Sequence, residues 1–513
     1  MTCRWGGETV RRLSAWHPRT CGRHLPLGCK DVELPHEPAE QGDAANGPPS
    51  AQAEVTDQDA PAAVAEHDPK TEHPVVSAFH RAAAEVPAYK CLLREAGAEP
   101  AQVRDVQDFR RIVPLTEKAN TFERFTLPDL CRGGELGKLA AVLTSSGHSG
   151  RFAFGLYDAI SGESAVQRID EALDAFFQVR SKPSLLINCL PMGVKVYTRA
   201  CTVAETSVRE DMVTALVKTF GPCYEQLILV GETAFIKRVL ELGGSQGIDW
   251  RTLLTQVIVG EEPLAENARI YLEDLLGVDP ERPETGTVIS SMGVAELGLN
   301  LFFETRPIIA LRRVLHLDES LRQAVLGPGV RHVPMLFTYD PARIFLEVIN
   351  DRKMVLSTLD PSRRIPFMRY ITGDEGERLL PSDSVKAAAA KAGVSPHELE
   401  ATPIVMVHGR GACARAGGKP VYPEQVKEGL YHEADLARQT TANFRLASGP
   451  QHATLRIQLL PDAGEPQALA ERFAEAVSHY ADAPLRVTCE PYADFRNGMS
   501  LDYERKFDYL EGA

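Results

Sequence analysis

The chain has 513 residues, 44% hydrophobic and 25% charged, a composition typical of a soluble globular protein with two or three domains. Its 56 Lys and Arg residues against 70 Asp and Glu residues give a net charge of −14, so general nucleic-acid binding is not expected. No apolar run approaches the roughly 18 residues that a bilayer crossing needs, which argues against a membrane span.

The N-terminal residues 1–74 are predicted to be a disordered tail. Residues 1–30 are rich in Arg, and residues 37–72 consist of Ala, Pro, Asp and Glu with almost no large apolar side chain that could offset the entropy of ordering. Arg11 and Arg12 are not followed by an apolar export segment. The ten cysteines form neither a CxxC pair nor a zinc-like cluster, so we expect a cytoplasmic protein.

From residue 75 onward the pattern predicts a layered α/β domain with largely parallel strands, which we extend to residue 405. Apolar residues at helical spacing predict helices at 77–96 and 158–177. Short apolar runs bounded by turn residues predict buried strands at 184–190, 226–230 and 255–259.

A smaller α+β domain joined by a hinge is predicted for residues 406–513. Between the two domains, residues 382–402 are expected to form a surface helix or linker insertion with a capped helix at 395–399. Strand and helix patterns alternate in the last part of the chain, and we group with it the strands at 404–408, 453–459 and 485–489 and the helices at 423–432 and 466–479.

A Ser/Gly-rich stretch at 144–151, preceded by an apolar strand at 139–143, carries the first sign of chemistry. Two glycines permit a sharp turn, and hydroxyls, N–H groups and one arginine can donate to phosphate oxygens. An ordinary loop is the alternative, because the stretch matches neither a Walker A loop, a dinucleotide fingerprint nor a nucleophile elbow. The residues predicted to bind phosphate are Ser145, Ser146, Gly147, His148, Ser149, Gly150 and Arg151.

The order of further segments strengthens this interpretation. The chain resembles adenylate-forming enzymes, which include acyl-CoA synthetases, and most of all the phenylacetate–CoA ligase branch with its Ser-Ser-Gly-Thr-Thr-Gly-Lys-Pro loop. The other segments that carry the resemblance are a Pro-Leu-Thr-Glu-Lys lead-in at 114–118, a Gly-Glu-Glu-Pro turn at 260–263, Ser-Ser-Met-Gly-Val-Ala-Glu at 290–296, Tyr-Ile-Thr-Gly-Asp at 370–374, and a hinge motif at 409–410 and 418–423.

The resemblance implies roles that the residue types can support. Glu296 would be a ligand of Mg²⁺, with a solvated acidic residue as the alternative. Asp374 would accept the ribose hydroxyls, unless it only caps a turn. Arg410 would reach nucleotide oxygens at the hinge, unless it forms a plain salt bridge between domains. The residues expected around the adenine are Gly260, Glu261, Glu262, Pro263, Ser291, Met292 and Gly293.

The C-terminal cation that such enzymes use in adenylation corresponds here to Lys506, with Arg505 or a merely solvated tail lysine as alternatives. Several positions depart from the family pattern. His148 and Arg151 replace a Thr and a Lys of the loop, and Met292 stands where an aromatic residue usually stacks on adenine. The sequence therefore suggests a divergent branch.

Taken together, these segments predict ATP-dependent activation of a carboxylic acid to an acyl-adenylate. The acyl group would then pass to the thiol of CoA, or to the phosphopantetheine of an acyl carrier protein. Apolar residues at 188–194 and 231–234 favour an aryl or medium-sized apolar acid. Two alternatives stay open: a nucleotide-binding protein that has lost turnover, and an adenylating enzyme that uses an amine acceptor.

Overall fold

The computed structural model describes residues 73–145, 152–191, 194–495 and 507–511, all within the second of the two units into which the chain divides, Glu54–Ala513. Most of the predicted tail, residues 1–72, lies outside this description. The first helix begins at Pro74, where His73 caps it by accepting from the Val75 N–H. In the described part of the chain, no helix combines the length and apolar character that crossing a membrane requires.

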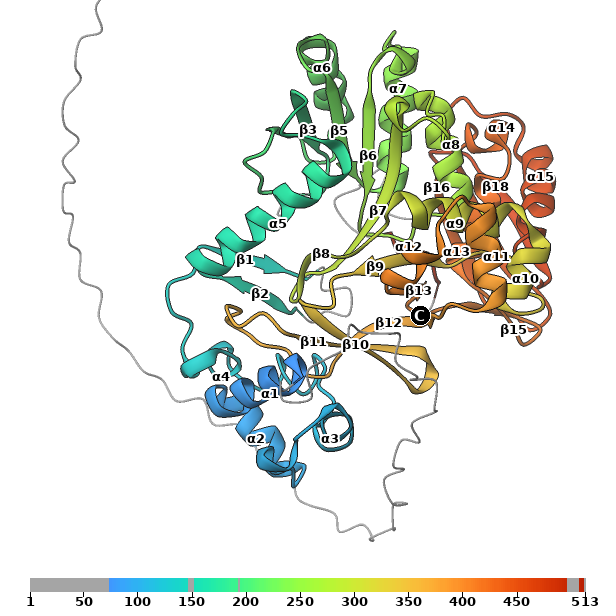
Figure 1. Cartoon of the computed structure of the whole chain (residues 1–513). Coiled ribbons are helices and arrows are strands. Elements are labelled where there is room, and N and C mark those ends of the chain that lie inside the picture. Colours follow the sequence, from blue (N-terminus) through green and yellow to red (C-terminus); the bar gives the residue numbers. More distant parts are fainter. Residues whose placement is uncertain (1–72, 146–151, 192–193, 496–506, 512–513) are drawn as a thin grey trace, which may run out of the picture. The chain divides into compact units, whose positions relative to one another are not determined.

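Five parallel strands make up one half of an eleven-stranded sheet (Figure 1), whose order is β10-β11-β12-β13-β9-β8-β7-β6-β5-β3-β4. All residues of β3 and β5 are buried, as expected when helices cover both faces of a parallel sheet. The elements of this half are β3 (Ser184–Asn188), β4 (Thr202–Glu205), β5 (Gln226–Gly231), β6 (Thr255–Val259), β7 (Gly286–Val294), α5 (Ala159–Phe177), α6 (Glu210–Phe220), α7 (Thr233–Ser245) and α8 (Glu266–Leu276).

Successive residues of these strands supply two different apolar cores, because side chains alternate between the faces of a strand. Leu186 and Ile228 pack in one cluster with residues of α5, whereas Leu185 and Leu227 pack in another with residues of α7. The predicted layered α/β arrangement is confirmed, and the carboxyl ends of β5, β6 and β7 meet at one edge, where ligands bind in open α/β sheets.

The other half of the sheet is antiparallel, so the expectation of largely parallel strands is correct only for the half that runs from β4 to β7. Its elements, together with the helices packed around them, are β8 (Gly298–Phe303), β9 (Met335–Tyr339), β10 (Ile344–Ile349), β11 (Lys353–Thr358), β12 (Tyr370–Leu379), β13 (Ile404–Gly409), α1 (Pro74–Glu85), α2 (Pro87–Glu95), α3 (Val106–Ile112), α4 (Leu127–Leu130), α9 (Arg306–Leu317), α10 (Glu319–Leu326), α11 (Asp383–Lys391) and α12 (Pro396–Ala401). The predicted helix at 77–96 is two helices, because Pro87 starts a new one.

One expectation about the middle of the chain is wrong: the strand at 404–408, which we grouped with the small domain, is β13 and pairs with β12 and β9 inside the large sheet. For residues 382–402 we expected a surface helix or a linker insertion, and the structure has helices. α11 and α12 connect two neighbouring strands and bury Val385, Ala388 and Leu399 in a core shared with α9. The cap predicted at the start of the second helix is present as a capping box, with Ser395 and Glu398 as its two side chains.

A two-stranded hairpin, β1 (Ala141–Thr144) and β2 (Phe154–Tyr157), carries the predicted phosphate loop at its tip. The strand predicted before that loop is β1. The hairpin lies close to the turn between β7 and β8, since a Cβ atom at Gly155 would lie only 2.6 Å from the carbonyl oxygen of Ala295. Glycine is therefore required at this point of contact.

The C-terminal segment, described at residues 414–495 and 507–511, forms a smaller sheet with helices, as predicted. The elements are β14 (Ala414–Ala416), β15 (Lys419–Val421), α13 (Pro423–Leu430), α14 (Ala434–Ala437), β16 (Thr440–Ala447), β17 (Ala453–Leu459), α15 (Pro466–Ser478) and β18 (Leu485–Glu490). β17 pairs antiparallel with β16 and parallel with β18. The predicted fold class, a mixed α/β chain with a large sheet and a small C-terminal sheet, is confirmed.

Candidate functional site

Glu296 occupies a tight turn between β7 and β8. The N–H of Leu297 donates to the Val294 carbonyl across 2.8 Å and closes the turn. Glu296 is 2% exposed, and its Oε1 accepts a 2.7 Å hydrogen bond from the Tyr370 hydroxyl. Lys118 Nζ lies 3.8 Å from the same oxygen. The structure thus holds a buried carboxylate between a phenol and an ammonium group.

Lys118 also reaches the base of the predicted phosphate loop, where its Nζ donates to Ser145 Oγ across 3.5 Å. Ser145 closes the hairpin: its N–H donates to the Ala153 carbonyl, and its Oγ accepts from the Ala153 N–H, both across 2.9 Å. The sequence placed Lys118 in a lead-in motif without a role; only the fold reveals its position. The other predicted loop residues lie outside the described residues: Ser146, Gly147, His148, Ser149, Gly150 and Arg151.

The backbone of the lead-in segment explains how Lys118 is positioned. Thr116 forms a parallel bridge with Tyr370, at the start of β12. Its N–H donates to the Arg369 carbonyl across 2.9 Å, and its carbonyl accepts from the Ile371 N–H across 2.8 Å. Because Lys118 follows two residues later, the same strand that carries Tyr370 also fixes the ammonium group beside Glu296.

Strand β12 carries two site residues, Tyr370 and Asp374. The strand is irregular between them, because Gly373 has φ +85° and the register against β11 shifts between Lys353 and Val355. Asp374 Oδ1 lies 3.8 Å from Nε of Arg410, so the predicted ribose carboxylate and hinge arginine are brought together. Burial, and then the charge of Glu296, raise the pKa of Tyr370 well above its usual value, so the phenol keeps its proton and donates.

Two glycines flank Arg410, and both have backbone conformations that disfavour other residues. Gly409 has φ +90°, and a Cβ there would lie 2.6 Å from Oε1 of Glu424. Gly411 has φ +66°, and a Cβ there would overlap Oε1 of Glu375. The path of the chain into and out of Arg410 therefore depends on glycine.

The two segments predicted to flank adenine lie side by side at the edge of the sheet. Residues 260–263 follow β6, and a Cβ at Gly260 would lie 3.9 Å from the carbonyl oxygen of Ser291. Ser291 Oγ donates to Oδ1 of Asn300 across 2.8 Å. Met292 is partly buried and packs on the large core, while Gly293 lies so close to the next strand that a Cβ there would stand 2.9 Å from the Gly298 carbonyl oxygen.

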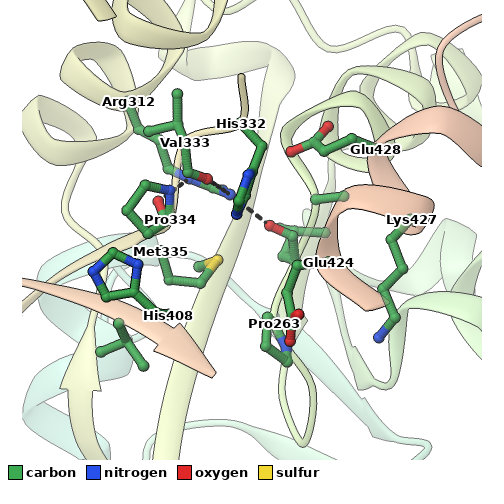
Figure 2. Close-up of a pocket in the computed structure, with 13 residues that line it drawn as sticks. Pro263, Arg312, His332, Val333, Pro334, Met335, His408, Glu424, Lys427 and Glu428 are labelled. Atoms are coloured by element: carbon green, nitrogen blue, oxygen red, sulfur yellow. Dashed lines mark hydrogen bonds between the residues drawn. The ribbon is translucent and has the colours of Figure 1, made fainter. Parts of the chain in front are cut away.

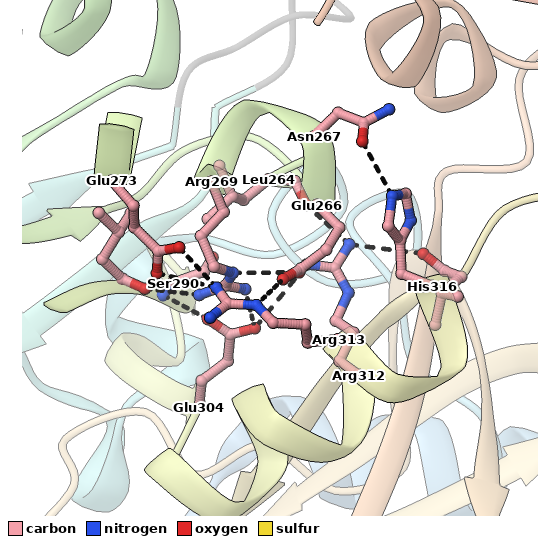
Figure 3. Close-up of polar contacts among 12 residues, drawn as sticks. Leu264, Glu266, Asn267, Arg269, Glu273, Ser290, Glu304, Arg312, Arg313 and His316 are labelled. Atoms are coloured by element: carbon pink, nitrogen blue, oxygen red, sulfur yellow. Dashed lines mark hydrogen bonds and ion pairs between the residues drawn. The ribbon is translucent and has the colours of Figure 1, made fainter. Parts of the chain in front are cut away.

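A buried network of charged side chains holds the chain directly after this turn (Figure 3). Arg312 donates to the Leu264 carbonyl across 2.8 Å and to Glu266 Oε2 across 2.9 Å, and Arg269 donates to the same oxygen across 3.0 Å. Burial alone would raise the pKa of Glu266, but Arg269, Arg312 and Arg313 outweigh it and lower the pKa to about 2. No sequence pattern pointed to this network.

A pocket lies behind Pro263, between the large sheet and α13 (Figure 2). It is lined by His332, His408 and Glu424, by the charged side chains of Arg312, Lys427 and Glu428, and by apolar side chains. Burial, and then the neighbouring His408, lower the pKa of His332 to about 4; burial also lowers the pKa of His408 and raises that of Glu424. Both imidazoles are therefore neutral at physiological pH. The pocket belongs to the surroundings of the 260–263 turn.

The described residues include no group of three or more His, Cys, Asp or Glu side chains that could hold a metal ion by themselves. The predicted catalytic cation Lys506 and its alternative Arg505 lie outside the described residues. Their neighbours 507–511 are described, and the Tyr509 hydroxyl donates to Oε2 of Glu262 across 2.9 Å.

Known proteins match this chain in structure only. No protein-family model matches the sequence, and no curated protein matches it. Among solved structures, 2-hydroxyisobutyryl-CoA ligase in the postadenylation state with R3-HIB-AMP is 12% identical, with 85% of this chain and 88% of that chain covered and a TM-score of 0.58. The same ligase with 2-HIB-AMP is 13% identical, with the same coverage and TM-score. The chain therefore shares the fold of an AMP-forming CoA ligase.

Proposed function

We propose that this protein is an AMP-forming acid–thiol ligase. A carboxylate attacks the α-phosphorus of ATP, pyrophosphate leaves, and the resulting acyl-adenylate passes its acyl group to a thiol with release of AMP. One observation carries the proposal: the ammonium group of Lys118 lies within reach of both Ser145 and Glu296, and Glu296 accepts from the Tyr370 hydroxyl. These four residues come from four distant segments, each part of a motif that carries the resemblance, and their convergence supports one nucleotide site.

The proposal gives each predicted residue a role, and the structure describes the surroundings of Lys118, Asp374 and Arg410. Lys118 and the donors of the 145–151 loop bind the β- and γ-phosphates, and Asp374 accepts the ribose hydroxyls with Arg410 beside it. Residues 260–263 and 291–293 flank the adenine. Lys506, or else Arg505, supplies a further cation against the charge that develops on the α-phosphoryl group.

Glu296 suits a magnesium ion that is shared with the nucleotide. Tyr370 and Lys118 both approach Oε1, and within the described part of the chain no contact to Oε2 is recorded. Mg²⁺ takes few protein carboxylates when phosphate oxygens and water complete its octahedron, which agrees with a single glutamate here. Bound Mg²⁺ neutralises charge on the phosphate groups.

The domain division is also a proposal. Its boundary, between residues 405 and 406, falls within β13, and the flexible point would be the Gly409 and Gly411 pair that follows. The part of the predicted 406–513 domain that follows this glycine pair would then move between the two half-reactions, while β13 stays in the large sheet.

For the acid, we propose an aryl or apolar substrate. The predicted segments 188–194, of which residues 192–193 lie outside the described residues, and 231–234 follow β3 and β5 at the carboxyl edge of the sheet. Leu190 is buried beside apolar residues of α5, and Cys189 is buried in the other core. The likeness to the phenylacetate–CoA ligase branch rests on motifs alone. CoA or a carrier-bound phosphopantetheine is the proposed thiol.

The test is pyrophosphate release by the full chain with MgATP and hydroxylamine, which intercepts the adenylate, across aryl, hydroxyaryl, amino and fatty acids. Release with one acid class is expected, and Glu296→Gln should lower it about 100-fold. Glu273→Gln, a second buried glutamate, is the matched control and should keep activity. ATP binding without acid-dependent release would contradict the proposal and favour a binding protein. Product formed with amines but not with CoA would favour an amine acceptor.

A further inference from the structure

The carboxylate of Glu262, in the turn predicted to face adenine, is held by two side chains of the C-terminal segment. Lys427, on α13, forms an ion pair with its Oε2, and the Tyr509 hydroxyl donates to the same oxygen across 2.9 Å. The side chains of Glu262 and Lys427 are 9% and 13% exposed. Contacts this well shielded from water are stronger than surface ion pairs.

Tyr509 is itself fixed in place. Its ring stacks on Phe444 with 4.5 Å between ring centroids, and Lys427 Nζ lies 4.4 Å from the Tyr509 ring centre. Its carbonyl accepts from the Leu446 N–H across 2.8 Å, and the Glu511 N–H donates to the Leu446 carbonyl across 3.0 Å. The phenol is therefore presented to Glu262 by strand β16 rather than by a loose chain end.

The turn that Glu262 belongs to needs outside support. Glu261 has φ +72°, a left-handed conformation that costs a residue other than glycine roughly 1–2 kcal/mol. Gly260 packs against the Ser291 backbone on one side, and Arg312 holds the Leu264 carbonyl on the other. Between these two fixed points, the C-terminal segment contacts the turn through the side chain of Glu262.

We propose that Tyr509 and Lys427 are positioning residues for the nucleotide: through the Glu262 carboxylate they set the 260–263 turn, so that the C-terminal segment takes part in binding adenine. This inference rests on the proposed function. Burial, and then the charges of Glu262 and Glu232, raise the pKa of Tyr509 well above its usual value, so the phenol donates throughout the physiological pH range.

The decisive variant is Tyr509→Phe, which removes the hydroxyl and keeps the ring on Phe444. A lost hydrogen bond to a charged group predicts about a tenfold rise in the dissociation constant of ATP and in KM for ATP, with kcat within about twofold. Amide hydrogen exchange of residues 258–264 should also quicken without nucleotide. Glu262→Gln combined with Tyr509→Phe should give less than the product of the single effects, because both remove one contact.

Tyr480→Phe is the matched control. Tyr480 is another buried tyrosine of the C-terminal segment that touches the large sheet's helices, since its hydroxyl accepts from Nδ2 of Asn267 across 2.6 Å. Loss of the Tyr480 hydroxyl should leave KM for ATP and the amide hydrogen exchange of residues 258–264 at wild-type values.

Two results would overturn the inference. One is an unchanged KM, dissociation constant and exchange rate in Tyr509→Phe; the other is an equal rise in both tyrosine variants, which would indicate a general structural role. Failure of the proposed function has a different signature. In that case the wild-type chain would itself release no pyrophosphate with any acid, whatever stands at position 509.

Discussion

Replacing Glu266 by Gln should lower the free energy of unfolding by about 3 kcal/mol at neutral pH. The carboxylate is fully buried and accepts from Arg269 and Arg312, so the neutral amide leaves buried guanidinium groups without their counter-ion. The arginines lower the pKa of Glu266 from an ordinary 4.5 to about 2, which at about 1.4 kcal/mol per pH unit corresponds to about 3 kcal/mol.

The pH dependence of this effect has a definite sign. A carboxyl group with a lowered folded-state pKa stabilises the fold fully above its unfolded pKa, near 4.5, and loses that stabilisation as the pH falls toward 2. The difference in the free energy of unfolding between wild type and Glu266→Gln should therefore be constant from pH 8 to pH 6 and should decrease below pH 4.5.

Glu273→Gln is the matched control, on the same helix and in the same network. Arg313 Nη2 pairs with Glu273 Oε2 at 2.6 Å, yet burial outweighs that arginine and raises the pKa of Glu273. Carrying the charge at neutral pH then costs folding free energy, so the amide should be neutral or stabilising, within about 1 kcal/mol of wild type.

Equilibrium urea unfolding of the full chain, followed by far-UV circular dichroism and tryptophan fluorescence, measures both variants at pH 8, 7 and 6. Trp250 is buried and donates to the Leu240 carbonyl, so its emission reports on the packing of α7. An equal decrease in the free energy of unfolding in Glu266→Gln and Glu273→Gln would refute the reasoning. A Glu266→Gln variant within 1 kcal/mol of wild type would refute it as well.

Three further predictions concern the site. Tyr370→Phe removes a hydrogen bond to the buried Glu296 carboxylate and should lower the free energy of unfolding by about 2 kcal/mol, with slower pyrophosphate release; urea unfolding and the release assay measure both. Gly411→Ala places a Cβ against Glu375 at φ +66° and should lower the melting temperature, whereas an unchanged one would contradict the glycine requirement. Asp374→Asn should raise KM for ATP about tenfold with the fold intact by circular dichroism.

Much of the fold was predictable because its signals are local. The strands β3, β5 and β6 each contain a short apolar run, which is the usual pattern of a strand buried on both faces. Strand β16 was missed because it opens with Thr440, Thr441 and Asn443, which are polar and yet buried. Their partner is Gln458 on β17, whose carbonyl and amide oxygens accept from them, and such a pairing exists only once the two strands are adjacent.

The candidate site was likewise predictable only where its signals are local. Glu296, Asp374 and Arg410 could be named from their motifs, because each motif is a short contiguous string. No role could be predicted for Lys118 and Tyr370 from the sequence. Their proximity depends on the pairing of Thr116 with β12, which joins segments more than 250 residues apart. Long-range pairing leaves no trace in either segment alone.

Lys118 also changes how the departures from the family pattern are to be understood. Arg151 replaces the lysine of the resembling phosphate loop, and a guanidinium is a planar fork rather than a compact point charge. The structure supplies an ammonium group from elsewhere, because Lys118 reaches both Ser145 at the base of that loop and the Glu296 carboxylate. Lys118 stands in the lead-in motif of the resembling branch, so it does not replace the loop lysine, but with Arg151 in the loop the proposed site still has one ammonium group.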